Sequence, residues 1–266
     1  MRFLAKAKII VKVINDNKLI FTLTSGVLVV ILGLIIVNHL EEKQRENEFR
    51  NKIKTSLDYA ERLMKRTKYE DALIVYNNLS SEISEKNDPF YGKLNFNLGM
   101  CHWRLSEKSN NEKNMLNSIY AFMEALKIYT IKKYPLDYAT TQNNIGLLYS
   151  ELAEIRDTEE NLKKTVQAYK EALKIYTIKK YPLDYATTQS NLGVAYAQFS
   201  YIRDIEGNLK KAVQGFKEAL KFFTIEKYPL THKRIMSNIE KIKVMKKFYD
   251  SLPEKNRKAI EGRDNK

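Results

Sequence analysis

Residues 124–142 read EALKIYTIKKYPLDYATTQ, and residues 171–189 repeat the same nineteen letters 47 residues later. A third copy with substitutions, EALKFFTIEKYPL, begins at Glu218, another 47 residues on. Self-similarity at a fixed period indicates stacked supersecondary units, because one such unit cannot bury its apolar face alone and needs its neighbours to complete a core. The repeat therefore predicts an extended binding surface rather than a catalytic pocket.

The unit between successive copies is predicted to be a pair of helices. Residues 138–155 and residues 161–178 both carry apolar or small side chains at steps of three and four residues, the pattern of an amphipathic helix. Asp157 predicts a turn and an N-cap between the two helices. Pro182 predicts the end of the second helix, with Asp184 as the N-cap of the next unit. Because the connection is short, the two helices must be antiparallel, and the expected fold class is all-α.

Small and large residues recur at fixed positions of each unit. A glycine follows an asparagine and an aliphatic residue at Gly99, Gly146 and Gly193, each 47 residues apart. Glycine inside a helix costs about 1 kcal/mol relative to alanine, so its repetition needs a packing reason. We expect a bulky residue of the second helix to fill the space above each glycine. The candidates at the same spacing are Phe122, Tyr169 and Phe216, beside the small residues Ser118, Thr165 and Ala212 and the alanines Ala125, Ala172 and Ala219.

The order of these residues resembles that of the tetratricopeptide repeat (TPR). The third unit shows it as Asn191, Leu192, Gly193 and Tyr196, then Ala212, Phe216 and Ala219, then Pro229. The resemblance covers roughly residues 50–250, although the usual period is about 34 residues, so a period of 47 predicts helices about two turns longer. It implies a right-handed superhelix, an α-solenoid, whose concave wall is lined by the first helix of each unit. From about Thr231 the pattern continues as a capping helix.

The chain before the repeats is predicted to hold a membrane anchor. No charged residue lies between Lys18 and Glu41, and these 22 positions span about 33 Å as a helix, enough for the hydrocarbon core of a bilayer. A cleaved signal peptide is the alternative, but its apolar core would be shorter and would end in small residues. The predicted organisation is a basic N-terminal tail at 1–18, a transmembrane helix at 19–40, the repeat domain with its capping helix at 41–250, and a basic, flexible tail at 251–266.

The residues that flank the predicted transmembrane helix bear on its orientation. Five Lys or Arg residues precede it and five follow it closely, so the positive-inside rule alone does not decide. In the reversed topology the short basic tail would have to cross the membrane. We therefore expect a single-pass protein with a cytoplasmic N-terminus and an extracytoplasmic repeat domain.

The composition excludes several classes of site. The single cysteine, Cys101, excludes an internal disulfide framework, and the three histidines show no metal-ligand spacing. No glycine-rich phosphate loop, nucleophile turn or other catalytic motif is present in the sequence, so we expect no enzyme activity, no cofactor and no metal. The formal net charge of +14 is compatible with an anionic lipid, nucleic acid or acidic protein as partner, or with a solvated lysine-rich surface.

The resemblance also implies which residues line the concave wall. Asn97, Asn144, Asn191 and Asn238 would form a ladder, whose amides can pair with the backbone of a bound peptide without reading its sequence. The alternative is that these amides make hydrogen bonds within the repeat. Trp103 would either anchor a peptide or fill the joint between the first two units. The complete set of expected wall residues is Lys93, Phe96, Asn97, Met100, Trp103, Arg104, Asn143, Asn144, Leu147, Glu151, Ser190, Asn191, Val194, Gln198 and Asn238.

The expected function is that of a membrane-anchored TPR scaffold or adaptor that holds a protein or peptide in its concave groove, in membrane complex assembly or protein translocation. Two alternatives stay open. A cytoplasm-facing nucleic-acid-binding protein would need a continuous basic face, and the glutamates that recur among the lysines argue against one. A self-assembling protein would stack its near-identical units between molecules to form a homo-oligomer.

Overall fold

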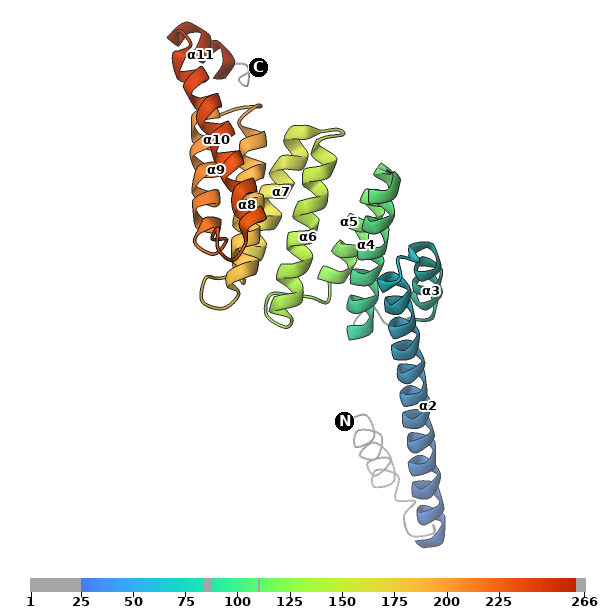
Figure 1. The fold of residues 1–266 in the computed structure, drawn as a ribbon. Helices are drawn as coiled ribbons and strands as arrows, with labels where there is room; N and C mark the ends of the chain where they lie inside the picture. Colours follow the sequence, from blue (N-terminus) through green and yellow to red (C-terminus); the bar gives the residue numbers. More distant parts are fainter. Residues whose placement is uncertain (1–24, 84–87, 110, 262–266) are drawn as a thin grey trace. The chain divides into compact units, whose positions relative to one another are not determined.

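The described part of the chain is entirely helical. The computed structural model describes residues 25–83, 88–109 and 111–261 (Figure 1). Over these residues it forms ten helices and no strand, which confirms the all-α prediction there. The helices are α2 (Ser25–Lys65), α3 (Tyr69–Glu82), α4 (Pro89–Ser109), α5 (Glu112–Leu126), α6 (Pro135–Ala153), α7 (Thr158–Leu173), α8 (Pro182–Phe199), α9 (Ile205–Leu220), α10 (Pro229–Ser251) and α11 (Glu254–Glu261).

The chain divides into two units. The first, Met1–Tyr59, has α2 as its described part, and the second, Ala60–Lys266, holds the end of α2 and all later helices. Within the described ranges, no helix combines the length and the apolar character that crossing a bilayer requires. The predicted transmembrane helix at 19–40 begins outside the described residues, and the predicted tail at 1–18 lies wholly outside them.

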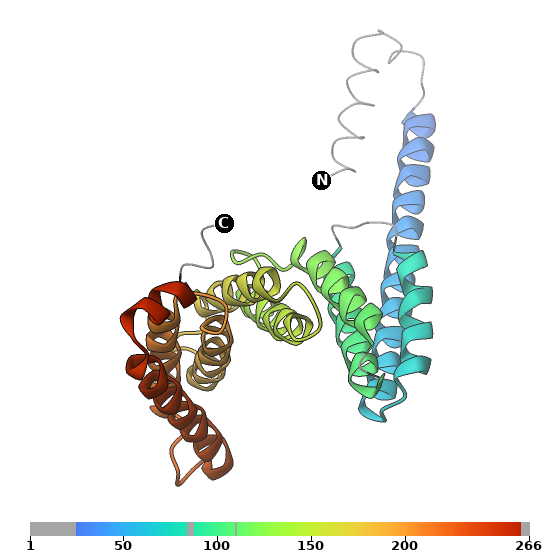
Figure 2. The same cartoon turned by 90° about the horizontal axis from the view of Figure 1, so that it is seen from above.

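The second unit is built from helical hairpins that follow one another in chain order (Figure 1). Helix α4 packs most extensively on α5, α6 on α7, and α8 on α9, and each hairpin contacts the next through α5 and α6 or through α7 and α8. Helix α10 packs against both α8 and α9, and Figure 2 shows the same succession after a turn of 90°. Because α6 also contacts α8, the first helices of these neighbouring hairpins lie side by side.

In each of three hairpins, a glycine of the first helix packs against an aromatic ring of the second, and we call this contact the joint. Gly146 of α6 has no side chain where the Tyr169 ring of α7 packs, and a Cβ there would lie 2.6 Å from the Tyr169 Cε1 atom. The other two pairs are Gly99 with Phe122, at 2.6 Å, and Gly193 with Phe216, at 2.9 Å. All three aromatic rings are almost completely buried. The predicted pairing of a glycine with an aromatic residue is therefore confirmed in each hairpin.

The helix boundaries differ from the predicted ones around each proline. Pro182 does not end the second helix, because α7 already ends at Leu173 and Pro182 is the first residue of α8, with Tyr181 as its N-cap. Asp184 thus lies in the first turn of α8 and is not its N-cap. Proline suits the first helical position because its φ is already helical and its missing N–H would have no acceptor there. The 47-residue period therefore includes an eight-residue connection, residues 174–181, and not only longer helices as predicted.

The segment 251–266, predicted as a flexible tail, contains the helix α11 in the structure. The carbonyl of Pro253 accepts the backbone N–H of Asn256 at 2.8 Å, which starts the helix. Lys258 pairs with Glu254 across one turn at 2.6 Å. The high charge of the segment suggested an irregular tail, but opposite charges four residues apart stabilise a helix.

Candidate partner-binding surfaces

The predicted wall residues all lie on the first helices of the hairpins. Helix α4 carries six of them, α6 four, α8 four and α10 one. Their side chains fall into three groups, which are bonded to a neighbouring helix, packed in the core, or open to a hollow in the surface.

Lys93 and Asn97 of α4 are both bonded to Glu61, near the C-terminal end of α2. Lys93 Nζ lies 2.9 Å from Glu61 Oε1, and Asn97 Nδ2 donates to the same oxygen at 3.1 Å. Burial alone would raise the pKa of Glu61, but these two partners and the charge of Lys65 outweigh it, and the pKa lies below its ordinary value. Both side chains therefore tie helices of the chain together, which leaves them less available to a peptide.

Phe96, Met100 and Trp103 pack into a core cluster that α4 shares with α5 and α6. All three are partly buried against this cluster, and the Phe96 ring centroid lies 5.5 Å from that of Phe122. The guanidinium of Arg104 lies over the Trp103 ring, 5.4 Å from its centroid. Other packed members of the predicted set are Leu147, Ser190 and Val194. These contacts favour the interpretation that Trp103 fills a joint over the one that it anchors a peptide.

The four asparagines of the predicted ladder do not form one continuous row of free amides. Asn144 is buried and donates to Met100 Sδ at 3.5 Å, and Asn97 is engaged on α2 as described above. Asn191 and Asn238 are partly exposed, and their side chains make no hydrogen bond with any described residue. The half of the ladder on α8 and α10 is therefore the part open to a partner.

The remaining polar residues of the wall connect neighbouring first helices. Asn143 of α6 accepts the hydroxyl of Thr188 of α8 at 3.1 Å. Gln198 of α8 accepts from Ser150 and donates to Glu154, both at 3.3 Å. Polar side chains of the expected wall thus form hydrogen bonds between α6 and α8. The sequence suggested bonds of this kind only as an alternative role for the four asparagines.

Three exposed apolar side chains lie at the C-terminal end of this wall. Tyr201, just after α8, and Val244 and Phe248 of α10 are 78%, 65% and 65% exposed. Tyr201 and Phe248 are 47 residues apart and so occupy the same position in successive units. Tyr201 also lines a hollow of ≈ 130 Å³ together with the predicted wall residues Gln198 and Asn238. We refer to Tyr201, Val244 and Phe248 as the α8–α10 patch.

An acidic hollow of ≈ 490 Å³ lies between α4, α5 and α6. Glu107, Glu151 and Glu154 contribute to its lining. Burial raises the pKa of Glu151, and repulsion from Glu107 and Glu154 raises it further, while the indole of Trp103 lowers it. The ionised form of Glu151 is therefore less stable than that of an isolated glutamate, and a cation bound in the hollow would stabilise it.

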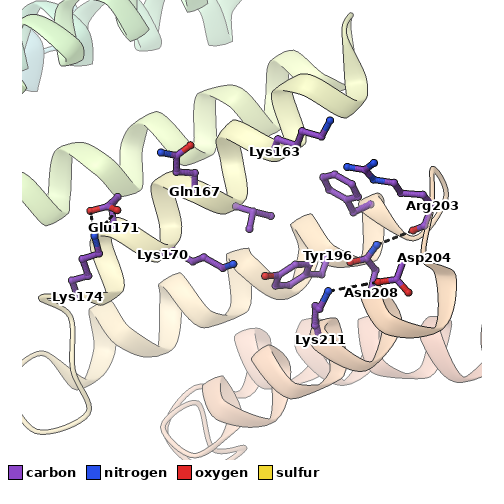
Figure 3. Close-up of a pocket in the computed structure, with 12 residues that line it drawn as sticks. Lys163, Gln167, Lys170, Glu171, Lys174, Tyr196, Arg203, Asp204, Asn208 and Lys211 are labelled. Carbon is purple, nitrogen blue, oxygen red and sulfur yellow. Dashed lines mark hydrogen bonds and ion pairs between the residues drawn. The ribbon is translucent and has the colours of Figure 1, made fainter. Parts of the chain in front are cut away.

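Two larger hollows lie on the second helices, where the sequence analysis predicted no site. One of ≈ 580 Å³ is flanked by α7 and α9 with α8 between them (Figure 3), and one of ≈ 500 Å³ adjoins it between α8 and α9. Tyr196 and Lys211 line both, so we treat the two as one outer groove. The sequence does contain a hint of this groove. Lys163 of α7 has Leu116 as its counterpart on α5, so the surface of the second helices changes from apolar to basic between units.

Comparisons with known proteins give no family for this chain. A search against protein-family models found no match, and a search of curated proteins found none either. Within the described ranges, no group of three His, Cys, Asp or Glu side chains is arranged to hold a metal ion. The function must therefore be inferred from the surfaces themselves.

Proposed function

We propose that the chain is a membrane-tethered scaffold of the TPR type, whose first helices line the concave wall of a right-handed superhelix and hold a protein or peptide partner. The observation that carries this proposal is the α8–α10 patch, whose three large apolar side chains are exposed and whose Tyr201 lines a hollow together with the unengaged amide of Asn238. Exposed apolar residues scattered singly are ordinary, but a group of them rimmed by polar side chains is typical of an interaction site.

The repeats support a binding role for the wall. Their residues are alike at the glycine–aromatic joints but differ from unit to unit along the wall. Three hairpins keep the same glycine and an aromatic ring at their joint. The wall position that holds Trp103 on α4 holds Ser150, Ala197 and Val244 in the following units. A purely structural rod would gain nothing from a different side chain at each step. Variation of this kind favours recognition of a partner that has different groups along its length.

We propose that the bound segment is extended and carries a cationic group as well as apolar side chains. The amides of Asn191 and Asn238 can each donate and accept, which suits the backbone of an extended peptide. Glu151 of the acidic hollow occupies, one hairpin earlier, the same position as Gln198 beside the patch. A segment that follows the wall from the patch toward α4 would therefore bring a lysine or arginine to the acidic hollow.

We further propose that residues 19–40 hold this scaffold at a membrane, with the N-terminus in the cytoplasm and the repeat domain on the other side. Confinement to a bilayer raises the effective concentration of the scaffold toward partners in the same membrane. This suits a role in the assembly of a membrane complex or in protein translocation.

A photo-crosslinking amino acid at Val244 of the full chain, in native membranes, tests the docking proposal. We expect a discrete adduct with another protein, because the Val244 side chain is exposed and lies one helical turn from Phe248 on α10. The substitution Tyr201→Glu should abolish this adduct by placing a charge in the apolar contact. The fold should tolerate it, since Glu107 and Glu154 stand at the equivalent position of two other units.

The matched control carries the same crosslinker in place of Lys132, which is exposed in the connection between α5 and α6. This position should give no adduct or an unrelated one. Docking on the patch is ruled out if both positions yield the same adduct equally, or if Tyr201→Glu leaves the Val244 adduct unchanged while the helical content stays at the wild-type level.

A further inference from the structure

The outer groove carries an excess of positive charge. The lining of its larger hollow holds five cationic side chains against two acidic ones. The cations are Lys163, Lys170, Lys174, Arg203 and Lys211, and the acids are Glu171 and Asp204 (Figure 3). Lys170 makes no ion pair or hydrogen bond with any described residue, and it extends into the hollow toward Tyr196 in Figure 3. An anionic group of a ligand would therefore meet an unpaired cation in the middle of the groove.

Lys174 is paired with Glu171 at 2.6 Å, whereas the other three cations of the lining are only partly neutralised. Lys163 and Arg203 share a single carboxylate, that of Glu159, at 2.6 Å and 3.1 Å. Lys211 lies 3.7 Å from Asp204, farther than a strong charged hydrogen bond. Ion pairs at an exposed surface are weak, so a carboxylate of a ligand can join or replace them at little cost.

The floor of the outer groove is apolar. It is formed by Val166 of α7 with Tyr196 and Phe199 of α8. Arg203 lies over the Phe199 ring and Lys211 over the Tyr196 ring, each 5.5 Å from the ring centroid. A groove with an apolar floor and a cationic rim is complementary to a segment that has one apolar face and one acidic face.

The repeats show that the lysines of this groove are not needed for folding. On α5 the positions of Lys163, Gln167 and Lys170 are taken by Leu116, Tyr120 and Met123. Helix α5 nevertheless forms the same hairpin, with the same glycine–aromatic joint. On α9 the corresponding residues are again Lys210, Gln214 and Lys217. The basic character of α7 and α9 is therefore a property of the surface, which the fold leaves free to vary.

We propose that the outer groove docks an acidic amphipathic helix of a partner protein. Recognition of this kind places apolar side chains at positions i, i+3, i+4 and i+7 into a groove between elements, while charges along the rim fix the register. A bilayer surface is flat and does not enter a hollow flanked by two helices. Nucleic acid would meet Glu171 and Asp204 in the lining. None of the expected wall residues lines this groove, so it is separate from the wall that the first helices are expected to line.

Binding of two defined peptides to the full chain, held in neutral-lipid nanodiscs, tests the proposal. One peptide has leucine along one helical face and glutamate elsewhere, and the other has lysine in place of every glutamate. We expect the glutamate peptide to bind with an affinity that falls as salt is added, and the lysine peptide not to bind. The double substitution Lys163→Leu and Lys170→Met should weaken this binding about tenfold, because it removes two positive charges of the groove. It gives α7 the residues that α5 already carries, so the hairpin should stay folded.

Lys179→Glu is the matched control for this double substitution. It lowers the net charge by the same amount, lies outside the groove lining, and introduces the residue that the next unit has at Glu226. It should leave the affinity unchanged, as should Tyr201→Glu on the first-helix wall. Three outcomes would each overturn the proposal. These are equal affinity for both peptides, full binding by the double variant, and binding of phosphatidylserine vesicles in preference to the glutamate peptide.

Discussion

Asp157 and Asp204 show how one neighbouring residue decides whether a helix is capped. Both precede a second helix and adopt a left-handed backbone, with φ of 45° and 46°. Asp204 accepts the backbone N–H of Gly207 at 3.1 Å, whereas the side chain of Asp157 makes no capping hydrogen bond. A Cβ on Gly207 would overlap the Asp204 carboxylate, and α7 has Glu160 at this position. We attribute the difference to the side chain of Glu160, and the Asp157 carboxylate lies instead 3.6 Å from Arg156 Nε.

Glycine substitutions at the two aspartates measure this difference. Glycine adopts a positive φ freely, so both substitutions relieve the same backbone strain. Only Asp204→Gly also removes a capping hydrogen bond, which contributes about 1 kcal/mol. We expect the free energy of unfolding of Asp204→Gly, measured in urea, to lie about 1 kcal/mol below that of Asp157→Gly. Equal values for the two variants would contradict the explanation.

Glu151 provides a second test at the level of one residue. Its pKa in the folded chain lies above the ordinary value of 4.5, so folding favours the protonated form. Protonated Glu151 therefore contributes to the free energy of unfolding. This contribution is fully present at pH values below the ordinary pKa and is lost as the pH rises through the raised pKa. Glu151→Gln, which introduces the residue of Gln198, should therefore unfold at a higher temperature than wild type at pH 7. At pH 3 the two should unfold alike, and a gain that persists there would contradict the assignment.

At the scale of helices, each hairpin depends on the joint between its glycine and its aromatic ring. Gly146→Ala places a Cβ 2.6 Å from the buried Tyr169 ring, which has little room to move. Overpacking costs about 1–3 kcal/mol, which outweighs the roughly 1 kcal/mol that alanine gains in helix propensity. We expect Gly146→Ala to lower the free energy of unfolding by about 1 kcal/mol in urea, with the circular dichroism of the folded state unchanged.

A second substitution identifies the cause. In the double variant Gly146→Ala with Tyr169→Leu, the smaller side chain should accommodate the added methyl group. The double variant should then be more stable than the sum of the two single effects predicts, because the residues are in contact. If the two effects simply add, the Tyr169 ring is not what makes alanine unfavourable at residue 146.

Local pattern predicted the helices and their joints but not the contacts between hairpins. The spacing of apolar residues is a property of each helix alone, so it located the helices and the Gly146–Tyr169 pairing. The partners of Asn97 and Asn144, Glu61 and Met100, lie 36 and 44 residues away. Such contacts depend on how successive first helices meet, which no local pattern contains.

The outer groove escaped prediction for a different reason. The TPR resemblance implies binding residues on the first helices, while Lys163 and Lys170 lie on a second helix. Considered on one helix, these lysines resemble an ordinary solvated surface. Only the structure shows that α7 and α9 flank one hollow with an apolar floor, so that the lysines line a groove.

In the molecule as a whole, the buried cysteine allows the proposed membrane topology to be measured. Cys101 is fully buried, its Sγ donates to the carbonyl of Tyr69 at 3.1 Å, and burial raises its pKa to about 12. A buried, protonated thiol is unreactive toward maleimides. A cysteine introduced at Lys255, which is exposed on α11, should therefore be the only reactive thiol of the folded chain.

We expect Lys255→Cys to react with a membrane-impermeant maleimide in intact cells, and the wild-type chain to remain unlabelled. Complete denaturation should expose Cys101 in both, which controls for the amount of protein. Labelling of Lys255→Cys only after the membrane is permeabilised would place the repeat domain in the cytoplasm and contradict the proposed orientation.

The identical stretches 124–142 and 171–189 each run from the end of one hairpin into the start of the next. Genetic exchange between them deletes or duplicates residues 138–184 in one piece, and YPLD still leads into YATTQ across the seam. The seam falls in the first turn of a first helix, where α6 and α8 have the same residues, so after a deletion the joined helix keeps the sequence of α8. After a deletion α4 and α8 become neighbours, the acidic hollow disappears, and the α8–α10 patch is kept. Such an exchange can therefore change the binding surface by adding or removing a whole hairpin, while every intermediate sequence still encodes a folded repeat domain.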